Sequence, residues 1–194
     1  MQLKSLVKFP SKVETNSGGG SSLYEAAAQH SSLGRESWAG LRKYCHSKLG
    51  EWWQWYQPYY SFPLQVTTYT RLSPPLPLYH LLIFQVKMKR EGSLPTQKTI
   101  PNAGEFLKFL KTEESLHCFY ISECELYCLA NILGITINVL THSVQGKPTA
   151  PAKWESFDPH QGLIHNNKFR GNNKEAMYCL HEDKVGFNRL VKLK

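Results

Sequence analysis

Apolar side chains recur at the three- and four-residue spacing of an amphipathic helix in several parts of the chain. This spacing predicts helices over residues 22–30, 35–48, 103–112 and 122–133. Gly50 and Gly134 stand where the second and fourth of these helices should stop. Asn102 precedes the third helix as a candidate cap.

Short runs of β-branched and aliphatic residues predict strands over residues 5–9, 135–141, 176–181 and 186–193. The stretches 11–21 and 142–175 are polar or rich in Gly, Ser, Asn and Pro, so we expect loops there. Helices come first, and a helix, a strand and a strand pair close the chain. This order predicts an α/β (α+β) fold, with a small twisted sheet flanked by helices.

The part of the chain from about residue 50 to 101 has a composition of its own. Residues 52–62 are dense in aromatics, residues 78–86 are apolar, and residues 87–101 are basic and rich in turn-forming residues. We interpret the aromatic rings as cover for the core, because aromatic side chains carry much of the buried apolar area. The alternative is a surface that stacks bases or binds a protein.

A glycine-rich run ending in Ser21 and Ser22 leads directly into the first predicted helix. Either serine could cap that helix. The free N–H groups at a helix start can also stabilise an oxyanion beside a nucleophile. Ser22 is therefore a candidate nucleophile, provided that another residue activates it.

Composition narrows the class of protein. The chain has 194 residues, 41% hydrophobic and 20% charged, which predicts a single globular domain over residues 1–194. No apolar run approaches the roughly 20 residues of a membrane span, and the first residues lack the apolar core of a signal peptide. Five cysteines without framework spacing indicate a reducing compartment. We expect a cytoplasmic or nuclear protein without a membrane partner.

The net charge of +8 suits an acidic partner such as nucleic acid, but it is also typical of a solvated basic surface. Basic residues are spread along the chain, which favours the solvated surface. Lys87, Lys89, Arg90 and Lys98 nevertheless give the middle segment a basic stretch near its aromatics. A nucleic-acid (RNA)-binding module therefore stays open as an alternative function.

Cys124 and Cys128 lie four residues apart on a predicted helix, with His117 and Cys118 just upstream. This spacing suggests a zinc site, but a second closely spaced cysteine pair is missing from the sequence. Cysteines on an apolar helix face are usually core residues. We expect core cysteines here, with no metal site and no cofactor.

Three motifs occur in a recognisable order. The run 19–24 reads Gly-Gly-Ser-Ser-Leu-Tyr, the helix 122–133 carries Glu125, Leu129 and Ala130 before an aliphatic strand, and residues 186–188 read Gly-Phe-Asn. Together they resemble the ovarian-tumour (OTU) family of deubiquitinating cysteine peptidases. The family motifs are Asp-Gly-Asn-Cys-Leu-Phe/Tyr, a helix with Glu-Leu and Leu-Ala, and His-Tyr/Phe-Asn. Residues 50–101 match no family motif and are expected to be an insertion.

The resemblance implies an OTU or papain-like cysteine-peptidase fold with a degenerate catalytic set. The corresponding positions are Ser22 for the nucleophilic Cys, Gly186 for the basic His, Gly19 for the Asp, and a retained Asn188. The oxyanion-loop equivalent is Gly19, Gly20 and Ser21.

A serine hydroxyl needs a positioned base, and glycine offers none. The resemblance therefore implies a catalytically inactive pseudo-deubiquitinase, a binding or regulatory module with a face for ubiquitin or another protein. An engineered exchange of Cys for Ser would leave Gly186 unexplained, so we take Ser22 as natural.

One residue could replace the missing base. His181 ends one predicted strand and Gly186 begins the next, so the imidazole could approach Ser22 across the strand pair. A general base needs hydrogen-bond contact with the group it deprotonates. A weak serine hydrolase that uses Ser22 and His181 is the remaining alternative, while an exposed turn histidine is the favoured interpretation.

Overall fold

A computed structural model describes residues 9–16, 21–34, 37–68, 96–117, 123–142, 153–164, 167–171, 173–182 and 186–192. The strands are β1 (Ser11–Glu14), β2 (Leu64–Thr68), β3 (Thr96–Ile100), β4 (Ile137–His142), β5 (Lys153–Phe157), β6 (Met177–Glu182) and β7 (Gly186–Lys192). The α-helices are α1 (Ser22–His30), α2 (Trp38–Glu51), α3 (Trp53–Tyr56), α5 (Ala103–Phe109) and α6 (Glu123–Leu133). Short 3₁₀ helices are η4 (Gln57–Tyr59), η5 (Glu113–His117) and η6 (Gln161–Leu163).

A five-stranded mixed sheet has the strand order β1-β7-β6-β4-β5. The β4–β6 pair is parallel, and the other neighbouring strands are antiparallel. In the β6–β7 pair, His181 stands opposite Phe187 and Leu180 stands opposite Asn188. Because successive side chains point to opposite faces, Phe187 and His181 share one face of the sheet and Asn188 lies on the other.

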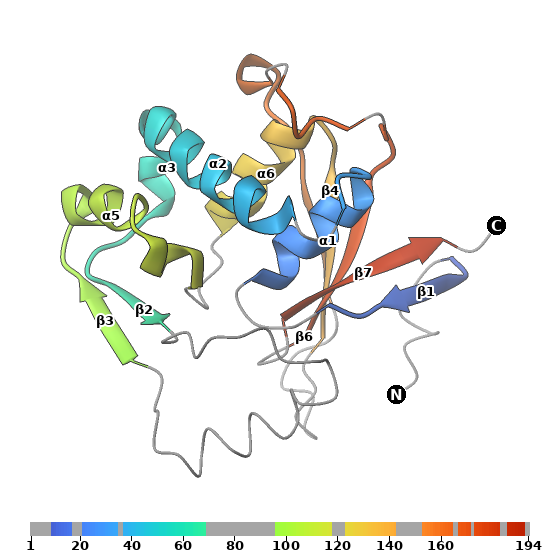
Figure 1. Ribbon diagram of the computed structural model, residues 1–194, viewed down its shortest axis with the longest axis horizontal. Coiled ribbons are helices and arrows are strands. Elements are labelled where there is room, and N and C mark those ends of the chain that lie inside the picture. The colour runs from blue at the N-terminus through green and yellow to red at the C-terminus, as the bar shows by residue number, and fades with distance from the viewer. Residues whose placement is uncertain are drawn as a thin grey trace, which may run out of the picture.

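The helices form layers against this sheet (Figure 1). α1 packs against β7 and β6, α6 packs against β5, and α2 lies across α1 and α6. Leu23, Tyr24 and the three alanines of α1 are completely buried. The helix that starts at Ser22 is therefore a central packing element of the fold.

A separate two-stranded sheet, β2–β3, lies with α5 away from the five-stranded sheet (Figure 1). Val66 and Ile100 are buried in the main core. Nearby, the Tyr60 ring lies 4.7 Å from the Phe106 ring and 5.3 Å from the Trp53 ring, measured between centroids. Much of the aromatic run therefore covers the core, as the sequence predicted.

The structure bears out several predicted elements closely. α1 has the predicted bounds, and α6, β6 and β7 agree to within one or two residues at each end that can be compared. Asn102 caps α5, because its side chain accepts a hydrogen bond from the N–H of Glu105 at 3.0 Å. Gly134 has φ of +67° directly after α6, the conformation expected of a helix-ending glycine.

Other predictions were wrong. β1 and β5 lie in stretches expected to be loops, and β3 lies in a stretch expected to be rich in turns. β1 and β5 are the two edges of the large sheet, where short strands with few apolar residues are common. α2 continues through Gly50, since one glycine costs a helix only about 1 kcal/mol and tertiary packing outweighs it.

Some predictions fall outside the described residues. They concern residues 5–8 of the first predicted strand, the apolar run 78–86, the basic residues 87–90, Cys118, and Ser122 as the first residue of the fourth predicted helix. Among the described helices, none combines the length and apolar character needed to cross a membrane.

Candidate functional site

Ser22 is the first residue of α1, and its side chain is completely buried. Its Oγ accepts a hydrogen bond from the backbone N–H of Phe187 on β7, with a length of 2.8 Å. The two residues are 165 positions apart in the sequence. The start of α1 is therefore bonded directly to the start of β7.

Asn16 strengthens this junction. Its Nδ2 donates to the backbone carbonyl of Ser22 at 3.0 Å and to that of Phe187 at 2.8 Å. Its backbone N–H donates to Oδ1 of Asn188 at 3.2 Å. All four residues are buried, so water competes little for these bonds. One asparagine thus joins the segment before α1, the helix start and β7.

The remaining members of the predicted catalytic set differ in their placement. Gly19 and Gly20 lie outside the described residues, and Gly186 is the first residue of β7. Ser21 is the N-cap residue but makes no side-chain capping bond, so that expectation was wrong for Ser21. Its φ and ψ of −88° and −16° are helical rather than extended, and its hydroxyl donates to Glu25 at 2.9 Å.

His181 does not occupy an exposed turn, and that interpretation was wrong. The residue lies within β6 and is half-buried. Its ring stacks on the ring of Phe187, with a centroid distance of 4.4 Å and an interplanar angle of 19°. This stacking fixes the plane of the imidazole next to β7, the strand whose Phe187 N–H is bonded to Ser22.

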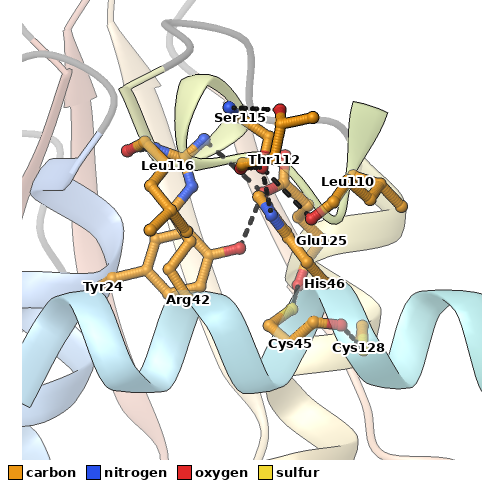
Figure 2. Close-up of polar contacts among 10 residues, drawn as sticks. All are labelled: Tyr24, Arg42, Cys45, His46, Leu110, Thr112, Ser115, Leu116, Glu125 and Cys128. Carbon is orange, nitrogen blue, oxygen red and sulfur yellow. Dashed lines mark hydrogen bonds and ion pairs between the residues drawn. The ribbon is translucent and has the colours of Figure 1, made fainter. Parts of the chain in front are cut away.

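A second group of polar side chains is buried between α1, α2 and α6 (Figure 2). Glu125 on α6 is at its centre. Its Oε1 accepts a hydrogen bond from the Tyr24 hydroxyl at 2.6 Å, and His46 Nε2 lies 3.2 Å away. Arg42 Nη2 lies 3.8 Å from the same oxygen. The Glu125 carboxylate is therefore directed at side chains from α1 and α2.

The cluster extends to η5 on its far side (Figure 2). Arg42 Nη1 donates to the carbonyl of Leu116 at 2.9 Å. His46 Nδ1 lies 3.2 Å from Ser115 Oγ, whose shortest contact is to the Thr112 carbonyl at 2.7 Å. The geometry therefore has the Ser115 hydroxyl donate to that carbonyl and accept from His46.

Ser115, His46 and Glu125 occur in the order of a nucleophile, a base and an orienting acid. Ser115 is only 1% exposed, however, and its proton is directed to a carbonyl rather than to the imidazole. A buried hydroxyl with that geometry is not activated for attack. We therefore assign this cluster a structural role, in which it holds three helices and η5 together.

The electrostatics of the cluster agree with that role. Burial alone would raise the pKa of Glu125, but the hydrogen bond from His46 and the positive charge of Arg42 hold it below its ordinary value. Burial, followed by neighbouring negative groups, raises the pKa of Tyr24. Glu125 thus stays ionised while Tyr24 keeps the proton that it donates.

The cysteines are core residues in the part of the chain that is described. Cys45, Cys124, Cys128 and Cys179 are all buried thiols. Burial raises the pKa of Cys128, and it raises that of Cys179 to about 12. Thiols of this kind are poor nucleophiles at neutral pH. The same described residues contain no group of three or more His, Cys, Asp or Glu side chains placed to hold a metal ion.

Comparison with solved structures finds this fold in OTU domains. The OTU domain of OTUD1 matches with a TM-score of 0.55 and 9% identity, over 94% of this chain and 86% of that chain. The viral OTU domain protease from Dera Ghazi Khan virus matches with a TM-score of 0.50 and 11% identity, over 95% of this chain and 82% of that chain. The chain therefore has an OTU-like α/β fold, with a central sheet flanked by helices. No protein-family model and no curated protein matches the sequence.

Sequence reasoning missed Asn16, Arg42 and His46. Asn16 lies in a polar stretch that gave no signal. Arg42 and His46 did give a signal in the sequence. They fall one turn apart, directly after the apolar positions Leu41 and Cys45 of α2. An arginine on the buried side of an amphipathic helix is rare unless it is paired, so the position of Arg42 pointed to a buried partner.

Proposed function

We propose that this chain is a non-hydrolysing OTU-like module that binds a protein partner, with ubiquitin as the leading candidate. One observation carries the first half of the proposal. Ser22, at the position of the family nucleophile, has no exposed side-chain surface, and its Oγ accepts the Phe187 N–H. A nucleophile must direct a lone pair at a substrate carbonyl within contact distance, and this one is turned into the protein.

Two further features support the proposal. Gly186, at the position of the family base, provides no proton acceptor on a side chain. Asn188, which would orient that base, has its Oδ1 bonded to the backbone of Asn16. The OTU-like fold is kept while the side chains that would perform hydrolysis are absent or bonded elsewhere. A fold retained under these conditions suits binding or regulation.

Hydrolysis is tested by incubating the protein with ubiquitin chains of several linkages and following the release of free ubiquitin. We expect no cleavage by the unaltered chain. We also expect none by Ser22→Cys, because position 186 still lacks a base. Cleavage by the unaltered chain that disappears in Ser22→Ala would contradict the proposal. If His181→Ala on its own also abolished that cleavage, the serine hydrolase alternative would be established.

Binding is tested separately by titrating monomeric ubiquitin and ubiquitin chains into the protein in a calorimeter. Saturable binding that Ser22→Ala leaves unchanged is the expected result, because a binding face does not need the buried hydroxyl. If neither form binds, ubiquitin is not the partner, whatever the outcome of the hydrolysis assay.

A nucleic-acid-binding module is the second candidate, favoured by the net charge of +8. Removing the whole of residues 50–100 would not test it, because Tyr56, Val66 and Ile100 belong to the core. A better variant exchanges Lys87, Lys89 and Arg90 for glutamine. A gel shift with single-stranded RNA that weakens with salt and disappears in this variant would support the candidate. No shift at low salt would eliminate it.

A further inference from the structure

The large hydrophobic side chains that stand exposed in the described part of the chain are Trp55 and Tyr59, at 46% and 60% exposure. They lie one turn apart, on α3 and η4. The Tyr59 ring lies 6.0 Å from the ring of Tyr127 on α6, between centroids. The Trp55 ring lies 4.8 Å from the ring of His160, which is itself exposed. Aromatic rings from three segments therefore gather on one surface.

Asn131 on α6 holds these segments together from beneath. Its Nδ2 donates to the hydroxyl of Tyr56 at 2.7 Å, and its Oδ1 accepts the N–H of His160 at 2.6 Å. Asn131 is almost fully buried and stands one turn after Tyr127. The exposed rings thus rest on a fixed frame, and little ordering would be needed for them to bind a partner.

Carboxylates border the rings. Glu123 stands one turn before Tyr127 on α6. The Tyr127 ring packs on the Phe157 ring at 5.0 Å between centroids, and Glu155 and Asp158 flank Phe157 at the end of β5. Burial, the nearby Tyr59 and these three negative charges raise the pKa of Tyr127, in agreement with that placement. Glu155 pairs with Lys153 at 2.7 Å, while Glu123 and Asp158 are exposed. The local charge is therefore negative, although the chain as a whole carries +8.

The aromatic–acidic face consists of Trp55, Tyr59, Tyr127, Glu123, Glu155 and Asp158. We propose that it is a docking surface for an arginine-rich segment of a partner protein. Guanidinium groups bind flat over Trp and Tyr rings and also form paired hydrogen bonds with carboxylates, so arginine suits both parts of the face.

The same charges argue against nucleic acid at this position. Stacking of bases on Trp55 and Tyr59 would bring phosphates toward Glu123 and Asp158, which lie on either side of the Tyr127–Phe157 ring contact, and like charges repel. The proposal does not depend on the state of Ser22 or on ubiquitin binding. None of the residues of this face belongs to the group of Asn16, Ser22, Phe187 and Asn188 that joins α1 to β7.

The test measures the fluorescence anisotropy of a labelled peptide of alternating Arg and Gly, with a Glu and Gly peptide as the probe control. Two double variants remove different parts of the face: Trp55→Ala with Tyr59→Ala, and Glu123→Gln with Asp158→Asn. The matched control is Glu105→Gln with Glu113→Gln. It also removes two exposed carboxylates, but these pair with Lys108 and Lys43 instead. Circular dichroism confirms that each variant is folded.

We expect the arginine peptide to bind and the glutamate peptide not to bind. Each double variant of the face should weaken binding by about tenfold, the effect of losing one or two cation–ring or ion-pair contacts. The control variant should bind like the unaltered chain. The proposal is overturned if the arginine peptide does not bind at low salt, or if the control variant weakens it as much as the variants of the face. It is also overturned if single-stranded RNA binds in a manner that Trp55→Ala with Tyr59→Ala abolishes.

Discussion

Removing the carboxylate of Glu125 should destabilise the fold more than removing any exposed carboxylate. In Glu125→Ala, the Tyr24 hydroxyl loses its acceptor at 2.6 Å, and the buried Arg42 guanidinium and His46 imidazole lose the carboxylate that faces them. Arg42 and His46 are only 1% and 4% exposed, so water cannot replace the lost partner. Breaking a buried ion pair by removing one member typically costs about 3–5 kcal/mol. For a chain of this size, that loss lowers Tm by roughly 6–20 °C.

The matched control for this experiment is Glu113→Ala. Glu113 pairs with Lys43 at 3.3 Å, and both side chains are more than two thirds exposed. Exposed pairs of this kind contribute about 0–1 kcal/mol. Urea unfolding followed by circular dichroism gives both free energies of unfolding, and unchanged m values would show that the denatured states are comparable. A loss for Glu125→Ala no larger than that for Glu113→Ala would refute the reasoning.

The same carboxylate should make stability depend on pH. The folded protein holds the pKa of Glu125 below its unfolded value, which is about 4.3. A depressed folded pKa contributes stability that is fully present above the unfolded pKa and is lost as pH falls through the folded pKa. The difference in unfolding free energy between the unaltered chain and Glu125→Gln should therefore be largest near neutral pH and shrink below about pH 4. A difference that stays constant down to pH 2 would mean that the carboxyl is not ionised in the cluster.

Further predictions concern other parts of the fold. Ser22→Ala leaves the buried N–H of Phe187 without its acceptor and should cost about 1–3 kcal/mol in urea unfolding; a neutral result would mean that the bond contributes nothing. Asn102→Ala removes the cap of α5 and should cost about 1 kcal/mol in the same assay, whereas Asn102→Asp should cost little. Gly171→Ala would place its Cβ 2.4 Å from the carbonyl oxygen of Ser31, so the backbone must move, and we expect a loss of about 1–3 kcal/mol; wild-type stability would show that the loop adjusts freely. Cys179, whose burial raises its pKa to about 12, should resist a water-soluble thiol reagent at pH 8 until the protein is unfolded.

The sequence predicted those elements whose apolar packing face lies within a single continuous segment. α1 and α6 each carry a complete apolar face. Gly134 ends α6 with a positive φ, as expected of a glycine at that position. β1 and β5 were missed because their structure comes from their neighbours. Each is an edge strand with few apolar residues, and each becomes a strand by pairing with β7 or β4. A pattern within one short segment contains no record of that pairing.

In the candidate site, too, the sequence predicted some features and not others. Motif order indicated Ser22 and residues 186–188 as the positions of interest, and the structure brings Ser22 to Phe187. The bond itself could not be predicted, because its donor is a backbone N–H and any residue other than proline would supply one. Asn16 was equally hidden, since its role depends on carbonyls from two distant segments meeting at its side chain.

The bonds between Ser22 and β7 and the buried cluster around Glu125 meet on the first turn of α1. Ser22 joins that turn to β7, and Tyr24, two residues later, joins it to Glu125 on α6. Because neighbouring residues point in different directions around a helix, these bonds hold the turn from different sides. Rigid placement of this turn is what a peptidase of this fold would need in order to present a nucleophile. Under our proposal the placement survives, but the serine oxygen is part of what maintains it. Supplying a base alone would therefore not create activity, because the Ser22 hydroxyl would first have to give up the Phe187 N–H and leave its buried position.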